Sequence, residues 1–139
     1  MPTAVDRVDS SVLLDVLLAD PQHAKSSEAA LREAMAQGGL VAGEVVIAEI
    51  TPVLAGASIR EFLFDWQIKF IPSSVESAAL AGAMFGIFLE RGGKRGRVVS
   101  DFLIAAHAQL HADGLLARDR GYYRDYFQKL NLRDPGLKK

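Results

Sequence analysis

Residues 97–119 read RVVSDFLIAAHAQLHADGLLARD, with one aspartate at the start of an expected helix and another at the end of an expected strand. A serine N-cap followed by apolar residues predicts a helix over 100–112, and 115–117 then form a short buried strand. Asp101 therefore opens the helix and Asp119 closes the strand. Open α/β folds keep their sites at this edge of the sheet, so further acids there would indicate a site.

Short apolar strands alternate with helices along the rest of the chain. The expected strands are 4–8, 40–42, 69–71, 115–117 and 130–132, and the expected helices are 12–18, 26–37, 45–54, 59–66, 74–91 and 100–112. This alternation predicts the α/β class, with a parallel sheet sandwiched between helices.

The composition is that of one globular domain spanning 1–139, because half of the 139 residues are apolar and can form a core. The net charge of −1 gives no global field for nucleic acid or an anionic membrane, so a polyanion must be held by local basic patches. The absence of cysteine excludes thiolate metal sites and suits a reducing cytoplasm. The longest uncharged run, 77–89, is too short to span a bilayer, so we expect a soluble protein.

Two further acids lie near elements of the expected sheet. Asp9 follows the first strand, where it could equally be an ordinary N-cap. Glu49 lies in the helix 45–54, on the apolar stripe expected to face the core. A lone buried carboxylate is costly unless it is paired, protonated or bound to a metal. The alternative for Glu49 is a glutamate that reaches solvent or forms a salt bridge.

Several other kinds of site are not supported by the sequence. His107 and His111 are four residues apart, as in the H-E-x-x-H zinc motif, but Ala108 replaces the glutamate. Both histidines are expected on the side of their helix away from Asp101, as surface or interface groups. The chain has neither a G-x-S-x-G elbow nor a phosphate-binding loop.

Each of two glycine-containing segments has two possible roles. Residues 91–97 carry four basic residues among three glycines, and this loop could grip a phosphodiester or be a solvated linker. Gly82 and Gly86 could permit close packing on the sheet or on a partner subunit.

Charge repulsion constrains how Asp9, Glu49, Asp101 and Asp119 could share one site. Two like charges about 4 Å apart cost on the order of 4 kcal/mol at an effective dielectric near 20, so a cluster of ionised carboxylates needs cations. Carboxylate oxygens without histidine or cysteine suit Mg²⁺ or Mn²⁺. Such a site can activate water and neutralise the charge that develops on a phosphodiester.

Four segments form an ordered set of motifs: VDSSVLLD at 8–15, IAEI at 47–50, SDFLIAAHA at 100–108 and LLARDRGYY at 115–123. Together they resemble the PIN-domain ribonucleases, and within them the VapC-like toxins of prokaryotic toxin–antitoxin pairs, over nearly the whole chain. The resemblance implies a three-layer α/β/α sandwich with a mostly parallel sheet of 4–5 strands. It also maps the family's catalytic, metal-binding acids onto Asp9, Glu49, Asp101 and Asp119.

The same resemblance implies a Mg²⁺-dependent or Mn²⁺-dependent endoribonuclease in which a metal-activated water cleaves RNA and leaves a 5′-phosphate. Single-stranded or looped RNA is the expected substrate. The implied partners are a second copy of the chain, in a homodimer, and a cognate antitoxin whose C-terminal segment lies in the active-site groove. Ser11 matches the family's small hydroxyl residue, whereas Ala117 stands where the family often has threonine. We expect Arg97, Arg118 and Arg120 to contact the RNA backbone.

Two alternatives belong to other functional classes. A phosphoaspartate phosphatase or phosphotransferase would also use an aspartate at a strand end with Mg²⁺. It would need a second acid two residues further on, where this chain has Ser11. A PIN-like RNA-binding module without turnover is the non-enzymatic alternative.

Overall fold

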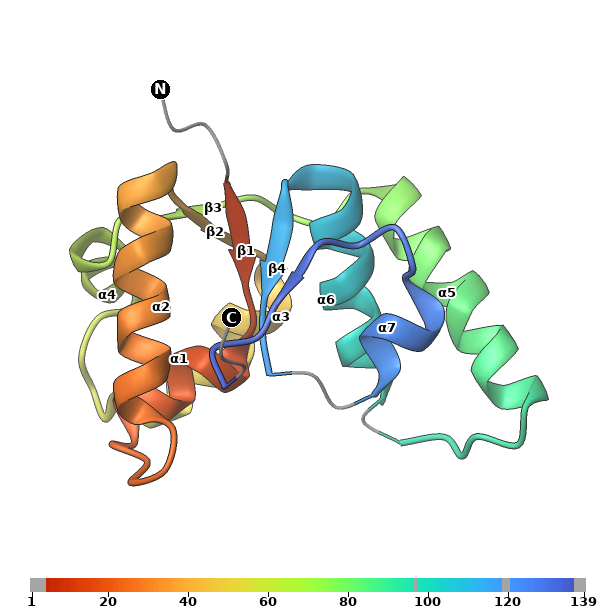
Figure 1. The fold of residues 1–139 in the computed structure, drawn as a ribbon, viewed down its shortest axis with the longest axis horizontal. Helices are drawn as coiled ribbons and strands as arrows, with labels where there is room; N and C mark the ends of the chain where they lie inside the picture. Colours follow the sequence, from red (N-terminus) through yellow and green to blue (C-terminus); the bar gives the residue numbers. More distant parts are fainter. Residues whose placement is uncertain (1–4, 97, 119–120, 137–139) are drawn as a thin grey trace.

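A parallel sheet of five short strands forms the centre of this computed structural model, which describes residues 5–96, 98–118 and 121–136. The strands lie in the order β3-β2-β1-β4-β5, so the first strand of the chain is the central one (Figure 1). They are β1 Asp6–Val8, β2 Leu40–Ala42, β3 Ile68–Phe70, β4 Gly114–Leu116 and β5 Leu132–Arg133. Every residue of β1, β2 and β4 is buried, as expected for parallel strands with helices on both faces.

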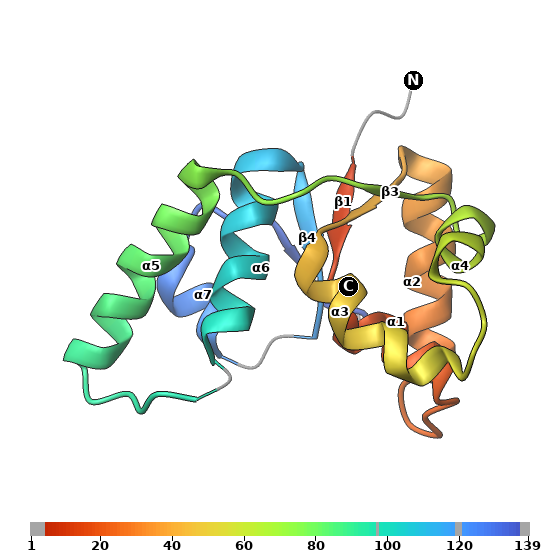
Figure 2. The same ribbon diagram turned by 180° about the vertical axis from the view of Figure 1, so that it is seen from behind.

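Helices cover both faces of the sheet, with α2 and α4 on one side and α5 and α6 on the other (Figures 1 and 2). The helices are α1 Ser10–Leu17, α2 Ala24–Gln37, α3 Glu44–Ile50, α4 Ile59–Asp65, α5 Val75–Glu90, α6 Val98–His111 and α7 Tyr122–Tyr126, with a 3-10 helix, η1 Thr51–Leu54, after α3. This arrangement confirms the predicted α/β/α sandwich with a parallel sheet.

Helix α6 is packed into the core along much of its length. Ile104, Ala105, Ala106 and Ala108 are at most 1% exposed. At the start of the helix, Phe102 is fully buried in a cluster of aromatic side chains from α5, α7 and Phe127, with ring centroids 5.3–6.1 Å from its own. Large buried aromatic side chains contribute strongly to core packing, so this cluster fixes the end of α6 that carries Asp101.

Some predicted boundaries were wrong. The helix expected over 100–112 begins at Val98, so Ser100 lies inside the helix and is not its N-cap. The helix expected over 45–54 is α3 followed by η1, and Pro52 lies in the first turn of η1. The last strand is Leu132–Arg133 where 130–132 was expected, and α7 was not predicted. Within the described ranges, no helix is both long and apolar enough to cross a membrane.

Candidate active site

Asp9 lies immediately after the central strand and immediately before α1. Its backbone amide donates to the carbonyl of Leu116 at 2.9 Å, which fixes it at the carboxyl end of β4. Asp9 occupies the N-cap position, but its side chain makes no capping hydrogen bond. The carboxylate is 3% exposed and accepts a hydrogen bond from the Ser11 hydroxyl at 2.7 Å. The ordinary N-cap explanation therefore does not account for this buried acid.

Glu49 approaches the same place from α3. The Ser10 hydroxyl donates to Glu49 Oε1 at 2.8 Å and lies 3.5 Å from Asp9 Oδ1. A hydroxyl has a single proton, so the shorter contact to Glu49 is the stronger hydrogen bond. Ser10 thus lies between two carboxylates that come from different elements.

The prediction that Glu49 faces the core was wrong, because its side chain is exposed. Val46 and Ile50 are the fully buried residues of α3. The predicted stripe continued through Pro52 and Val53, but α3 ends at Ile50 and the chain continues as η1. The helical phase changes there, and Glu49 remains at the border between core and solvent.

The remaining predicted acids are distributed differently. Asp101 is half-buried in the first turn of α6. In Figures 1 and 2 the start of α6 lies toward the same end of the molecule as α1 and the end of β4. Asp119 lies outside the described residues, as do Arg97 and Arg120.

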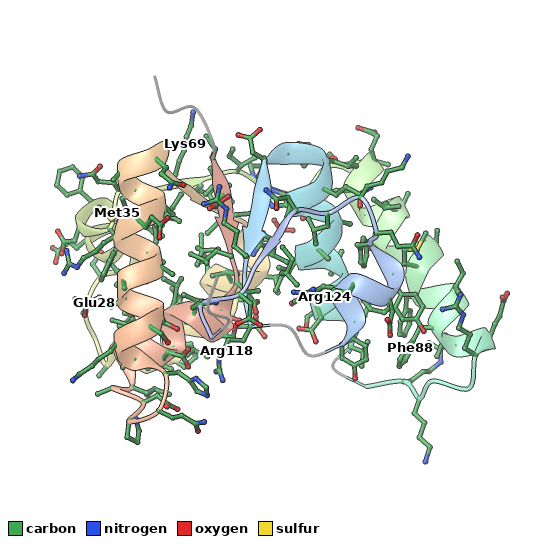
Figure 3. All side chains as sticks on the ribbon, viewed as in Figure 1. Glu28, Met35, Lys69, Phe88, Arg118 and Arg124 are labelled. Carbon is green, nitrogen blue, oxygen red and sulfur yellow. The ribbon has the colours of Figure 1, made fainter. Side chains whose placement is uncertain are left out.

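Arg118 is described, and its guanidinium is engaged inside the protein. Arg118 Nη2 donates to Asp15 Oδ1 at 2.8 Å, and the Ser27 hydroxyl donates to the other Asp15 oxygen at 2.6 Å. Asp15 is 3% exposed, whereas the Arg118 side chain is 32% exposed. Figure 3 shows Arg118 at the end of the sheet where α1 begins. Arg118 thus joins α1 to the segment after β4.

The donor chemistry at Asp9 and Glu49 fits a hard cation, because the contacts that join them to Ser10 and Ser11 in the described structure are made by carboxylate and hydroxyl oxygens. Within residues 5–96, 98–118 and 121–136, no group of three histidine or acidic side chains has the arrangement of a metal site. A complete set of protein ligands would therefore need a residue outside these ranges, or a movement of Asp101 toward the other two.

The region behind the site contains a polar pair that the sequence did not predict. Arg7, in the middle of β1, donates from Nε to His107 Nδ1 at 3.0 Å. His107 was expected to be a surface or interface group, which is wrong, since it is fully buried within the protein. Burial, the charge of Arg7 and the nearby His111 lower the pKa of His107 to about 4, so the imidazole is neutral near pH 7. His111 is half-buried and makes a hydrogen bond of 2.8 Å with the Ser74 hydroxyl.

The parallel order β3-β2-β1-β4-β5, with acids after the central strand and on α3 and α6, defines an α/β/α protein of the PIN type. The chain belongs to the PIN-domain family, whose model matches residues 8–127. This confirms the family predicted from the four motifs.

Solved structures of similar fold come from several bacteria. FitAcB from Neisseria gonorrhoeae is 17% identical, with a TM-score of 0.68, covering 96% of this chain and 99% of the other. VapBC2 from Rickettsia felis, bound to a DNA fragment from its promoter, is 15% identical, with a TM-score of 0.65 and coverages of 94% and 98%. VapBC-5 of Mycobacterium tuberculosis, a member of the VapBC family of toxin–antitoxin systems, is 21% identical, with a TM-score of 0.58 and coverages of 94% and 97%. No curated protein matches the chain.

Proposed function

We propose that this protein is a Mg²⁺-dependent or Mn²⁺-dependent endoribonuclease and the toxin of a toxin–antitoxin pair. The observation that carries the proposal is the meeting of the buried Asp9 with Glu49 on either side of the Ser10 hydroxyl. Two carboxylates from separate elements, with hydroxyl donors and no imidazole or thiol between them, suit a hard divalent cation.

In this proposal Asp9 and Glu49 hold the cation, together with Asp101 and Asp119. When bound, the cation supplies an activated water and neutralises the charge that develops on the phosphodiester. Ser11 donates to one oxygen of Asp9 and so orients the carboxylate. Ser10 donates to Glu49 and orients its carboxylate in the same way. Glu49 itself lies on the exposed side of α3. Arg97, Arg118 and Arg120 are the proposed contacts to the RNA backbone.

The partners are proposed from the solved structures of the same fold. VapBC-5 is a member of a family of toxin–antitoxin systems, and VapBC2 was solved with promoter DNA. We infer that this chain binds a cognate antitoxin, forms a homodimer and acts in the cytoplasm on single-stranded or looped RNA.

The test is RNA cleavage by purified Asp9→Asn, Glu49→Gln and Asp101→Asn variants in Mg²⁺ or Mn²⁺. Each is expected to lose at least about 100-fold in rate, or about 2.7 kcal/mol of transition-state stabilisation. Asp65→Asn, at an exposed position of α4, is the matched control and should cleave like the parent. Parent activity in chelator, or full activity of Asp101→Asn, would contradict the assigned site. RNA binding without cleavage would favour the non-catalytic module, and hydrolysis of small phosphate esters would favour the phosphatase.

A further inference from the structure

A cavity of about 420 Å³ is lined by side chains of α5, the last turns of α6, α7 and the segment that follows α7. Figure 1 shows α7 beside α5 and α6. The cavity is separate from Asp9 and Glu49, which belong to the elements that follow β1 and β2. Pockets for small ligands typically measure about 300–1,000 Å³, so the volume suits a group of the size of one nucleotide.

The walls of this cavity, which we call the α5–α7 cavity, are largely apolar. Leu80, Met84 and Ile87 line it from α5, and Tyr126 and Phe127 line it from the other side. Phe127 is buried, whereas Tyr126 and the three α5 side chains are only half-buried. Apolar and aromatic walls of this kind can cover the flat faces of an unpaired base.

Arg91 and Tyr126 form a stacked pair at the cavity. The guanidinium carbon of Arg91 lies 5.2 Å from the centroid of the Tyr126 ring. Arg91 is the C-cap of α5 and is exposed, so its planar group remains accessible from solvent while one face covers the ring. Unpaired bases of RNA stack on arginine planes as well as on aromatic rings, so this pair can extend its stack by one base.

The polar groups of the cavity match the rest of a nucleotide. Arg91 and Lys129 are exposed cations, and Asp125 is the acid among the lining residues, so the charges sum to +1. Arginine and lysine are the usual contacts to backbone phosphates. Gln109 and Gln128 each carry an amide that can donate to and accept from the edge of a base. An excess of positive charge next to amides and a stacking pair favours a nucleotide over a purely apolar ligand.

The cavity is connected to the candidate site through the aromatic cluster around Phe102. The Tyr126 ring lies 5.3 Å from the Phe102 ring, centroid to centroid. Phe102 follows Asp101 in the first turn of α6. A single cluster of packed rings therefore holds both a wall of the cavity and the turn that carries a candidate acid. An RNA strand that passes the acids can thus reach the cavity with a neighbouring nucleotide.

We propose that the α5–α7 cavity is a subsite for one unpaired nucleotide of the RNA, with its base stacked on the Arg91–Tyr126 pair and its phosphate near Lys129. The assignment of this nucleotide to a substrate rests on the proposed function, whereas nucleotide binding by the cavity does not.

The first test is binding of a fluorescently labelled single-stranded oligoribonucleotide in chelator, where metal-dependent cleavage does not interfere. Arg91→Met keeps an unbranched side chain but removes the planar cation, and it should weaken binding by about fivefold or more, as loss of a base-stacking contact does. Arg60→Met is the matched control, because Arg60 is an exposed arginine of α4 on the other side of the sheet. It should bind within about twofold of the parent, since salt screens distant surface charges. Equal effects of the two substitutions would mean a general charge effect and would overturn the proposal.

An abasic oligoribonucleotide of the same length separates base recognition from phosphate recognition. It carries the same phosphates but no ring that could stack on Arg91. The preference for the intact over the abasic strand should therefore be about fivefold or more smaller in Arg91→Met than in the parent. Structural damage would weaken binding of both strands and leave this ratio unchanged. An unchanged ratio overturns the proposal.

The unsubstituted protein gives an independent readout. Photocrosslinking to RNA that contains 4-thiouridine is expected to modify Tyr126 or Phe127, identified by peptide mass spectrometry, and crosslinks confined to α2 and α4 overturn the proposal. Parent-like RNA binding by Arg91→Met, in a protein that still cleaves RNA, overturns the subsite alone.

A parent that neither binds nor cleaves RNA contradicts the proposed function, and the cavity is then tested with adenosine and uridine monophosphates. Nuclear magnetic resonance should show shifts of the Gln109 and Gln128 side-chain amides in the parent that are reduced in Arg91→Met. Absence of these shifts at millimolar nucleotide overturns the proposal.

Discussion

The Ser10 hydroxyl donates to Glu49 Oε1 at 2.8 Å, across 39 residues of sequence. This hydrogen bond joins the first residue of α1 to the last turn of α3, so it ties together the helices that follow β1 and β2. Glu49 is exposed and Asp9 is buried, and Ser10 lies between them. The candidate site therefore depends on a serine that neither catalysis nor metal binding would require by itself.

Replacing Ser10 by alanine is expected to release Glu49 from its orientation. Loss of a supporting hydrogen bond to a ligand typically lowers metal affinity or activity by about 10- to 100-fold. We expect a loss of about tenfold in RNA cleavage at limiting Mg²⁺, with partial recovery at saturating Mg²⁺. Ser26→Ala, on α2, is the control and should leave the Mg²⁺ dependence unchanged. Parent-like Mg²⁺ dependence in Ser10→Ala would show that Ser10 does not support the site.

Acidification is expected to destabilise the protein through His107. Its pKa is lowered to about 4 in the folded state, mainly by burial, from an ordinary value of 6.5. Between these values the unfolded chain binds more protons, so stability falls as pH is lowered from about 6.5 toward 4. The loss reaches up to about 3 kcal/mol over this range. Urea unfolding at pH 7 and pH 5 measures it, and His107→Gln should show a smaller difference between the two. An equal difference in both proteins would assign the effect to other groups.

The ion pair of Arg118 with Asp15 is expected to matter more for stability than a pair on the surface. Arg118→Met leaves the buried Asp15 carboxylate without its cation and should cost about 2–4 kcal/mol. Glu28→Gln removes an exposed i,i+4 pair with Arg32 and should cost less than about 0.5 kcal/mol. The free energies of unfolding of the two variants give the comparison. Similar small losses would mean that solvent screens the Arg118 pair as it does the surface pair.

Replacing glycine by alanine is expected to destabilise the protein where the glycine is closely packed and to stabilise it where there is space for a methyl group. A Cβ on Gly114 would lie 2.8 Å from the Asn131 carbonyl oxygen, so Gly114→Ala should destabilise the sheet by about 1–3 kcal/mol. Gly82 is exposed on α5 and a Cβ there would meet nothing within 4 Å in the described structure. Gly82→Ala should therefore stabilise the protein by about 0.5–1 kcal/mol through helix propensity. Thermal unfolding measures both variants, and destabilisation by Gly82→Ala would indicate packing against a partner subunit.

Much of the fold could be predicted because short buried strands carry a strong local signal. The strand Leu40–Ala42 has the predicted bounds, and α4 ends within one residue of its prediction. Parallel strands are apolar on both faces, so their pattern does not depend on which face meets which helix. The start of α6 was harder to predict, because its first turn is fixed by the aromatic cluster around Phe102 and not by a serine cap.

The candidate site could be predicted from the sequence only for residues whose place follows from the neighbouring strand or helix. Asp9 was predicted from its place after the first strand, and the structure leaves its carboxylate free of capping bonds. The burial of Glu49 was mispredicted, because the end of α3 at Ile50 removes the residues that defined its apolar face. Arg7 and His107 are 100 residues apart in sequence, so their contact is a tertiary feature without a local pattern. The one available signal was an arginine in the middle of a strand expected to be buried.

The sheet order has a consequence for the growing chain on the ribosome. Of the five strands, the central strand β1 is synthesised first, whereas its neighbour β4 (Gly114–Leu116) is synthesised more than 100 residues later. A nascent chain that has reached residue 96 holds Asp9 and Glu49 but not Asp101, and β1 still lacks one of its two neighbours. The full set of candidate acids is therefore absent from any nascent chain that has not been extended past Asp101.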